Sequence, residues 1–264
     1  MRDRLRQNRA LLERAVLAFI LPGVAGAINA SGFFAVGVYT SHMTGHVARI
    51  GDELAAGHFW LATRAMIWVG SFLCGALIAT FLVLYGRRNG RRPWWRPLLL
   101  ECALLLVFAT VNVGAESGAH LGSLQMTALL CCAMGLQNAL VTKLSGARIR
   151  TTHLTGVTTD VGIELARAID QWRQRSRGLG LTGRLGQLPS LRGDPELKKL
   201  RLHLAVLGSF LIGATAGPLC YLLVGHIAIL VPCAILAGLA AFDGFIGLDH
   251  SVGQPSDAQR HRPA

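Results

Sequence analysis

Two short segments of matched composition hold the side chains of this sequence that are best suited to bind a ligand. Each has the order His-x-Thr-Gly, and each histidine follows an asparagine, by 13 residues in the first segment and 15 in the second. Histidine changes its charge near neutral pH, and threonine hydroxyls and asparagine amides bind polar groups. The predicted substrate-binding residues are Asn29, His42, Thr44, Asn138, His153 and Thr155. In the structural alternative, the histidines are hydrogen-bonded framework residues, while glycine and threonine allow helices to pack closely.

Charged residues stand about two helical turns beyond each histidine. Seven residues after the first comes Arg49, and seven after the second comes Asp160; four residues later both segments have a glutamate, Glu53 or Glu164. Arg49 is expected to pair with Glu53 along its helix. Asp160 and Glu164 repel each other instead, and Asp160 meets Arg49 only if the two segments converge. With Asp243, deep in the last apolar stretch, these residues are the candidates for ion pairs or a proton relay.

Other polar residues are weaker candidates for catalysis or for binding a metal or cofactor. The sequence has no HExxH, Gly-x-Ser-x-Gly, Walker or Rossmann motif, and none of its six cysteines has Cys-x-x-Cys spacing. We therefore expect no catalytic residue, no metal and no cofactor. Glu101, inside an apolar stretch, is expected to form a local ion pair with Arg96. If the protein is an enzyme, its possible ligands are His42, His46, Glu53, His153 and Glu164.

The segments that position these residues are long and apolar. The 264 residues are 52% hydrophobic and 15% charged, whereas a soluble domain has about 25% charged residues. This composition argues against an ordinary soluble enzyme and against a disordered chain. Each apolar run is long enough, or nearly so, to cross a bilayer core of about 30 Å as a helix. The six runs are residues 15–38, 61–85, 98–114, 121–144, 202–224 and 227–248.

Basic residues alternate with these runs. Of the 26 lysines and arginines, 24 lie in the N-terminal segment, in the loops after the second and fourth runs, or in the C-terminal tail. Lysine and arginine collect on the cytoplasmic side of membrane proteins. We therefore predict a bacterial inner-membrane protein with both termini in the cytoplasm. The net charge of +12 indicates this orientation, and no nucleic-acid-binding motif accompanies it.

The two halves of the chain repeat the same motifs in the same order. GAINA at 26–30 matches GLQNA at 135–139, and SHMTGHVARIGDEL at 41–54 matches THLTGVTTDVGIEL at 152–165. GSFLCGA at 70–76 then matches GSFLIGA at 208–214, and CALL from Cys102 matches CAIL from Cys233. Since each half has three crossings, an odd number, the second half enters the membrane from the opposite face.

The fold predicted from this repeat is an all-α integral membrane protein with about six transmembrane helices. They form a 3+3 inverted-topology repeat, with a short polar or re-entrant helix after the first helix of each half, capped by a hydroxyl of the Ser/Thr cluster. The single membrane domain comprises half one at about 15–114, half two at about 121–248 and a basic cytoplasmic loop at about 170–201.

The motifs resemble those of the YoaK-like family of bacterial inner-membrane proteins (domain of unknown function 1275). The similarity rests on Gly-x-x-Asn-Ala, Ser-His-Met-Thr-Gly, Met-Gly-Leu-Gln-Asn-Ala and Thr-Thr-His-Leu-Thr-Gly, and it covers about residues 15–248. It implies an integral protein of roughly six helices, without an established substrate or reaction. The basic stretch at 173–199 is expected to be an insertion beyond the shared core.

The architecture favours a small-molecule or ion permease whose substrate, still unknown, binds at the interface of the repeats. This function requires a polar cavity, lined by Asn29, His42, Asn138, His153 and Asp160. A membrane-embedded enzyme and a non-catalytic scaffold with dry, tightly packed motifs are the alternatives. The expected partners are the lipid bilayer, the substrate and, as an open option, further copies of the chain; nucleic acid is not among them.

Overall fold

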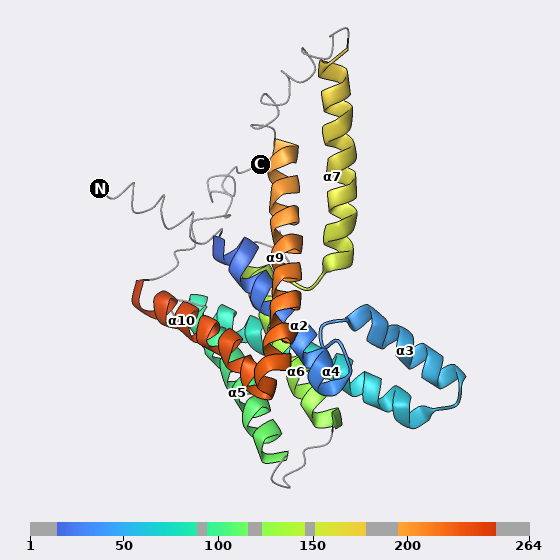
Figure 1. Ribbon diagram of the computed structural model, residues 1–264, viewed down its shortest axis with the longest axis vertical. Coiled ribbons are helices and arrows are strands. Elements are labelled where there is room, and N and C mark those ends of the chain that lie inside the picture. The colour runs from blue at the N-terminus through green and yellow to red at the C-terminus, as the bar shows by residue number, and fades with distance from the viewer. Residues whose placement is uncertain (1–14, 89–93, 116–122, 146–150, 178–194, 247–264) are drawn as a thin grey trace, which may run out of the picture.

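The computed structural model describes residues 15–88, 94–115, 123–145, 151–177 and 195–246, and every regular element in these ranges is a helix (Figure 1). The first half of the chain contains η1 (Val16–Ile20), α2 (Leu21–Val36), α3 (Met43–Ala55), α4 (Phe59–Arg88) and α5 (Trp95–Ala115). The second half contains α6 (Ser123–Leu144), α7 (Leu154–Arg175), α9 (Pro195–Val224), η3 (Gly225–Ile229) and α10 (Leu230–Ile246). The predicted all-α class is confirmed.

The first long helix begins with a π-helical turn, η1, directly before Pro22 of α2. Proline has no N–H to donate and is favoured at the start of a helix, where that N–H would have no partner in the helix. Two carbonyls here accept hydrogen bonds from other helices: that of Phe19 from the Ser209 hydroxyl, and that of Leu21 from the Gln137 amide at 3.3 Å. The start of the chain's first apolar helix is thereby tied to both α9 and α6.

Two helix crossings depend on glycines that admit a neighbouring backbone. At the crossing of α2 with α9, a Cβ atom added to Gly26 would overlap the carbonyl oxygen of Phe210. At the crossing of α4 with α6, a Cβ atom added to Gly135 would overlap the carbonyl oxygen of Phe72. Gly26 and Gly135 occupy matched positions of the sequence motifs, and so do Phe210 and Phe72. The same close approach therefore occurs twice, each time between one helix from each half.

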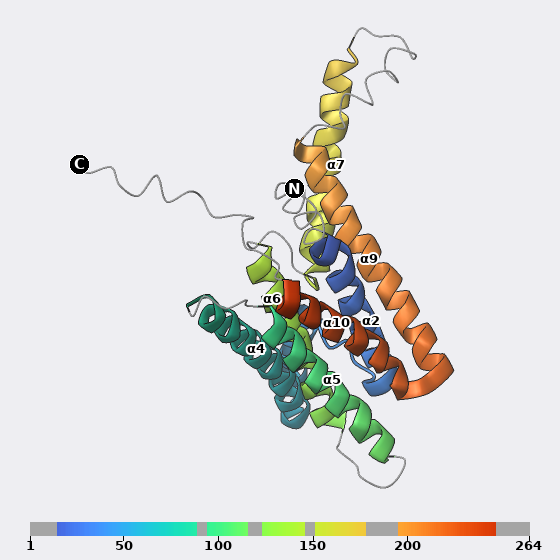
Figure 2. The same cartoon turned by 90° about the vertical axis from the view of Figure 1, so that its left-hand side faces the viewer.

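The third pair of helices, α5 and α10, pack against each other, as Figure 2 shows. The Cys102 thiol donates to the Cys233 carbonyl at 3.6 Å, and the Cys233 thiol donates to the Cys102 carbonyl at 3.9 Å. These cysteines also occupy matched positions in the two halves. Residues related by the sequence motifs thus contact each other directly at this interface.

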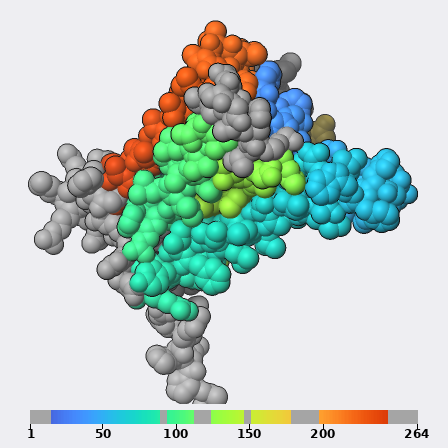
Figure 3. All heavy atoms as spheres, turned by 90° about the horizontal axis from the view of Figure 1, so that it is seen from below, coloured from blue at the N-terminus to red at the C-terminus, as the bar shows by residue number. Residues whose placement is uncertain are grey.

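The two helices that follow the His-x-Thr-Gly segments lie outside the core of the bundle. α3 packs on α4, and α7 packs on the first part of α9. Both helices are amphipathic and mostly exposed. They extend in different directions, α7 upward beside α9 in Figure 1 and α3 to the right with the start of α4 in Figures 1 and 3. Neither is among the segments long and apolar enough to cross a membrane.

The surface of the bundle is apolar over much of its area. Leu223 is 82% exposed, Ile212 71% and Phe59 70%, and many other large apolar side chains of α4 and α9 are exposed as well. Such surface is stable in lipid and unfavourable in water. Within the described residues, four segments are long and apolar enough to cross a membrane: Val16–Val36, Phe59–Arg88, Leu124–Leu144 and Leu197–Asp243. The chain is an all-α membrane protein, and the count of six crossings stays a prediction.

Candidate functional site

Both predicted histidines occupy the N-cap position of a helix. His42 precedes α3 with φ −85° and ψ 63°, and His153 precedes α7 with φ −86° and ψ 53°. Neither helix has a side-chain hydrogen bond at its cap, so the predicted hydroxyl cap is wrong. Instead, each imidazole covers the glycine three residues later, because a Cβ atom at Gly45 or Gly156 would overlap the ring. The spacing in His-x-Thr-Gly has a structural explanation in both segments.

The two matched asparagines differ in what they bind. The Asn29 Oδ1 atom accepts a hydrogen bond from the Ser41 backbone N–H at 2.9 Å, which fastens the turn before α3 to α2. The Asn138 Oδ1 atom is buried, and no hydrogen-bond donor reaches it within the described part of the chain. Leaving a buried polar atom without a partner costs about 1–3 kcal/mol. The Asn138 oxygen therefore has no donor among the described residues, whereas the Asn29 oxygen already has one.

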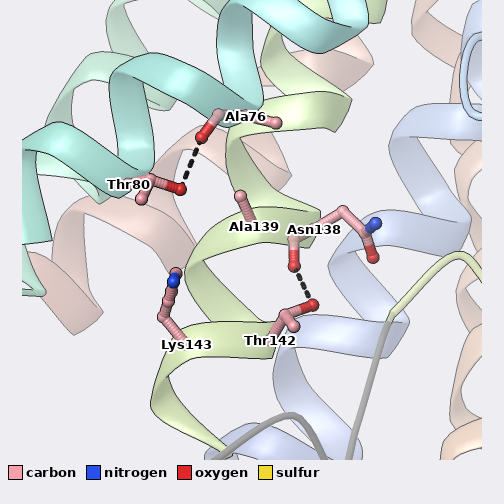
Figure 4. A pocket seen from close by; sticks show the side chains of 6 residues that line it. All are labelled: Ala76, Thr80, Asn138, Ala139, Thr142 and Lys143. Carbon is pink, nitrogen blue, oxygen red and sulfur yellow. Dashed lines mark hydrogen bonds between the residues drawn. The ribbon is translucent and has the colours of Figure 1, made fainter.

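Asn138 borders an open hollow of about 240 Å³ between α4 and α6. Figure 4 shows its lining: Ala76 and Thr80 from α4, and Asn138, Ala139, Thr142 and Lys143 from α6. The two threonine hydroxyls donate to carbonyls of their own helices, at 2.8 Å and 2.7 Å. In Figure 4 the Asn138 amide points toward α2, away from the Lys143 side chain. Of the five residues expected to share one cavity, this hollow includes Asn138 alone.

The remaining predicted binding residues lie apart from this hollow. His42, Thr44, His153 and Thr155 are exposed, the first two at the start of α3 and the other two at the start of α7. No hydrogen bond or ion pair between described residues joins α3 to α7. The structure therefore places the two histidine segments on separate helix pairs.

The charged residues of α3 and α7 adopt different arrangements. Arg49 pairs with Glu53 at 3.4 Å, which confirms that expected contact, and Glu53 also contacts the His58 ring at 3.0 Å. Glu164 turns away from Asp160 and binds the His203 Nδ1 atom at 3.0 Å, where both side chains are largely buried. Asp160 is exposed. Arg49 and Asp160 do not pair with each other in the structure.

Two carboxylates in the apolar helices are fully buried and differ in their partners. Asp243, on α10, is fully buried, and its Oδ2 atom accepts the Trp95 backbone N–H at 3.1 Å, so that it caps the start of α5. Glu101 is also fully buried, and neither of its carboxyl oxygens has a hydrogen-bond partner among the described residues. The expected pair of Glu101 with Arg96 is wrong. The Arg96 guanidinium lies instead over the rings of Tyr85 and Trp95.

Several polar residues at these interfaces were not among the sequence candidates. Gln137, directly before Asn138 in the repeated motif, binds the Leu21 carbonyl, while its own Oε1 atom is buried without a partner in the described residues. His203, whose position no repeated motif marks, binds Glu164. The adjacent Asn138 could have drawn attention to Gln137. Within the ranges that the structure describes, no three His, Cys, Asp or Glu side chains come together as a metal site.

Comparisons with known proteins agree with the membrane character of the fold. The family described as "Protein of unknown function (DUF1275)" matches residues 17–242. The "UPF0700 transmembrane protein YoaK" of Bacillus subtilis (strain 168) is 28% identical over 236 residues, which cover 86% of this chain and 92% of that protein. No solved structure matches the chain. The resemblance found in the repeated motifs is thus confirmed: the chain belongs to the DUF1275 family of membrane proteins of unknown function.

Proposed function

We propose that this protein is a permease for a small molecule or ion in the bacterial inner membrane, built as a 3+3 inverted-topology repeat with both termini in the cytoplasm. One half comprises about residues 15–114, the other about 121–248, and the basic loop at about 170–201 is cytoplasmic. Secondary transporters are often built from such repeats and bind their substrates where the repeats meet.

The observation that supports this proposal most is that helices of one half pack against helices of the other half at matched positions. α2 of the first half crosses α9 of the second, and α6 of the second crosses α4 of the first, through glycines at matched positions. At the remaining pair, α5 and α10, the matched cysteines bind each other's carbonyls. A two-fold axis between Cys102 and Cys233 accounts for all three contacts.

A polar solute has potential partners on α6. The Asn138 Oδ1 atom and the Gln137 Oε1 atom are neighbouring buried acceptors, neither of which has a donor in the described residues. Both belong to the motif that is repeated in α2, on the helix that packs against α4 and α2. A bound cation or a hydrogen-bond donor of a solute would satisfy these oxygens. The substrate site we propose therefore centres on Asn138, and the other predicted binding residues, Asn29, His42, Thr44, His153 and Thr155, belong to the proposed path of the solute outside the hollow beside Asn138.

Uptake into proteoliposomes tests the permease proposal. Monovalent cations, inorganic anions, amino acids and sugars are each supplied with and without a pH gradient, because Glu164 and Asp243 are candidates for a proton relay. We expect flux of at least one class above protein-free vesicles, and a marked loss of that flux in Asn138→Ala. Gln125→Ala, an exposed polar site on the same helix, is the matched control and keeps the flux. Folded protein without flux for any class contradicts the proposal.

A non-catalytic membrane scaffold is the second candidate, and the tight glycine crossings favour it. Helices that meet backbone to backbone at Gly26 and Gly135 leave no space for a solute at those points. Cysteine pairs placed across each crossing distinguish the two functions. In a permease that alternates between two states, locking one crossing with a disulfide stops flux, whereas a scaffold has no flux to stop.

A further inference from the structure

Glu101 lies at the contact of α5 with α10, where a helix of one half packs against a helix of the other (Figure 2). It directly precedes Cys102, whose thiol binds the Cys233 carbonyl across this contact. The Glu101 carboxyl is close enough to the Cys233 thiol for the two groups to interact electrostatically. Glu101 is therefore near the two-fold axis proposed between the matched cysteines.

The Glu101 carboxyl group has no hydrogen bond to satisfy it. The side chain is fully buried, and both of its oxygens are without a partner in the described residues. The other acidic candidates for a proton relay already have structural contacts, since Asp243 accepts the Trp95 N–H and Glu164 binds His203. Of these three carboxyl groups, Glu101 alone is not occupied by a contact between described residues.

No positive charge is placed to balance an ionised Glu101. The other charged groups on α5 and on the elements that pack against it are Arg96 on α5, Asp243 on α10, His226 on η3, Lys143 on α6, and Arg64, Arg87 and Arg88 on α4. None of them is hydrogen-bonded to Glu101. The α6 thiols of Cys131 and Cys132 face α4 instead, beside Trp68 and Cys74. A buried carboxylate without a cation is strongly disfavoured, so this carboxyl group retains its proton.

The packing of the two halves does not explain why position 101 is acidic. By the motif offset, the residue of α10 that corresponds to Glu101 is Pro232, which has no polar side chain. An apolar side chain of similar size would fill the same space and leave no polar atom without a partner. Positions that break the rules of packing in this way are typical of functional sites.

Release of the proton would change which arrangement of the helices is favoured. An ionised Glu101 is unfavourable while the α5–α10 contact excludes water and cations, and it is less unfavourable once the contact opens. The protonated form therefore favours the arrangement in the structure, and the ionised form favours an open one. A ligand that binds two states with different affinity shifts the balance between them, and a proton is such a ligand here.

We propose that Glu101 holds the coupling proton of the permease, retaining it in the arrangement that the structure shows and releasing it when the α5–α10 contact opens. The role in transport rests on the proposed function, whereas binding of the proton at Glu101 does not. Glu101 does not line the hollow beside Asn138. The proton and the solute thus have separate sites, coupled through the movement of the helices.

Infrared spectroscopy of the full chain in nanodiscs tests the proton site, because a protonated carboxyl group and a carboxylate have different C–O stretching bands. We expect the unaltered protein to show a carboxylic-acid band at neutral pH and to lose it at alkaline pH. Glu101→Gln, which has a similar shape but no exchangeable acid proton, should lack this band. Asp52→Asn, which alters an exposed carboxyl group on α3, is the control and should keep it. The proposal is overturned if Glu101→Gln keeps the band or if no such band responds to pH.

Proteoliposomes test the coupling of this proton to transport. For a solute class that the unaltered protein carries, a pH gradient should drive accumulation above the level reached without the gradient. Glu101→Gln should abolish this accumulation but keep the exchange of labelled for unlabelled solute, which needs no net movement of protons. Asp52→Asn should keep both activities.

Two outcomes in proteoliposomes contradict the coupling role, and they differ in what else they contradict. Accumulation in Glu101→Gln that equals that of the unaltered protein overturns the role of Glu101 and leaves the permease intact. A lack of flux in the unaltered protein contradicts the permease and the coupling role together. In that case the infrared measurement still decides by itself whether Glu101 binds a proton.

Discussion

The contact of α3 with α4 and that of α7 with α9 are two versions of one arrangement. Both start with a histidine at an N-cap, folded over a glycine, and both place an amphipathic helix along a long apolar one. Their charges differ: the first has the exposed pair of Arg49 with Glu53, and the second has the buried pair of Glu164 with His203. The backbone arrangement therefore depends on small residues and on the histidine–glycine contact, while the ionic residues differ freely between the halves.

The largest effect should come from filling the glycine crossings. We expect Gly26→Ala and Gly135→Ala each to destabilise the fold by about 1–3 kcal/mol, since the added methyl group must push two backbones apart. Thermal unfolding of the purified protein in detergent measures the loss. Gly70→Ala and Gly208→Ala are the controls, because they occupy matched positions with no other atom near the added group. A loss of stability in only one of the two variants would show that the two crossings are not structurally equivalent.

The buried ion pair should contribute more than the exposed one. Glu164 and His203 have side-chain exposures of 7% and 15%, against 16% and 45% for Glu53 and Arg49. We expect Glu164→Ala to cost about 2 kcal/mol, because it leaves His203 without its acceptor, and Glu53→Ala to cost less than about 1 kcal/mol. Unfolding midpoints in detergent compare the two variants. Equal losses would show that burial does not distinguish these pairs.

A gain in stability is expected at Glu101. This side chain is fully buried on α5, its oxygens have no partner in the described residues, and the matched position on α10 is Pro232. Glu101→Leu removes an unsatisfied polar group while filling a similar volume, so we expect about 1–3 kcal/mol of added stability. Glu101→Gln, which stays polar, should give no such gain. A destabilised Glu101→Leu would indicate that the carboxyl group has a partner after all.

The sequence predicted more of the helices than of the site. The six apolar runs correspond to long helices, because length and hydropathy determine both, and the helices α3 and α7 follow the repeated histidine motif as expected. The sequence did not indicate which helices pack against each other. Nothing in the spacing of Gly26 indicates that it meets Phe210, since a helix crossing joins residues far apart in the chain.

Site residues were harder to predict for a related reason. The spacing of Arg49 and Glu53 lies within one helix, so their pair was predictable, whereas Glu164 binds His203 on another helix. The histidines of the repeated motif suggested ligand binding, yet their rings cover the glycines beside them. A motif repeated in both halves can therefore reflect a shared backbone requirement as readily as shared chemistry.

Acid should weaken the α3–α4 contact and leave the α7–α9 contact less affected. Burial lowers the pKa of His46 below its ordinary value of 6.5, so as the pH falls the unfolded chain binds this proton before the folded chain does. Stability due to neutral His46 is therefore complete above pH 6.5 and is lost below it. The protection factors of the α3 amides, that is, their exchange rates relative to the intrinsic rates at the same pH, should fall there in the unaltered protein and in His226→Gln, a control on η3. His46→Gln should lose this part of the acid response. The matched residue of α7 is Val157, which cannot titrate, so an equal fall in the protection factors of α7 would assign the acid effect to another group.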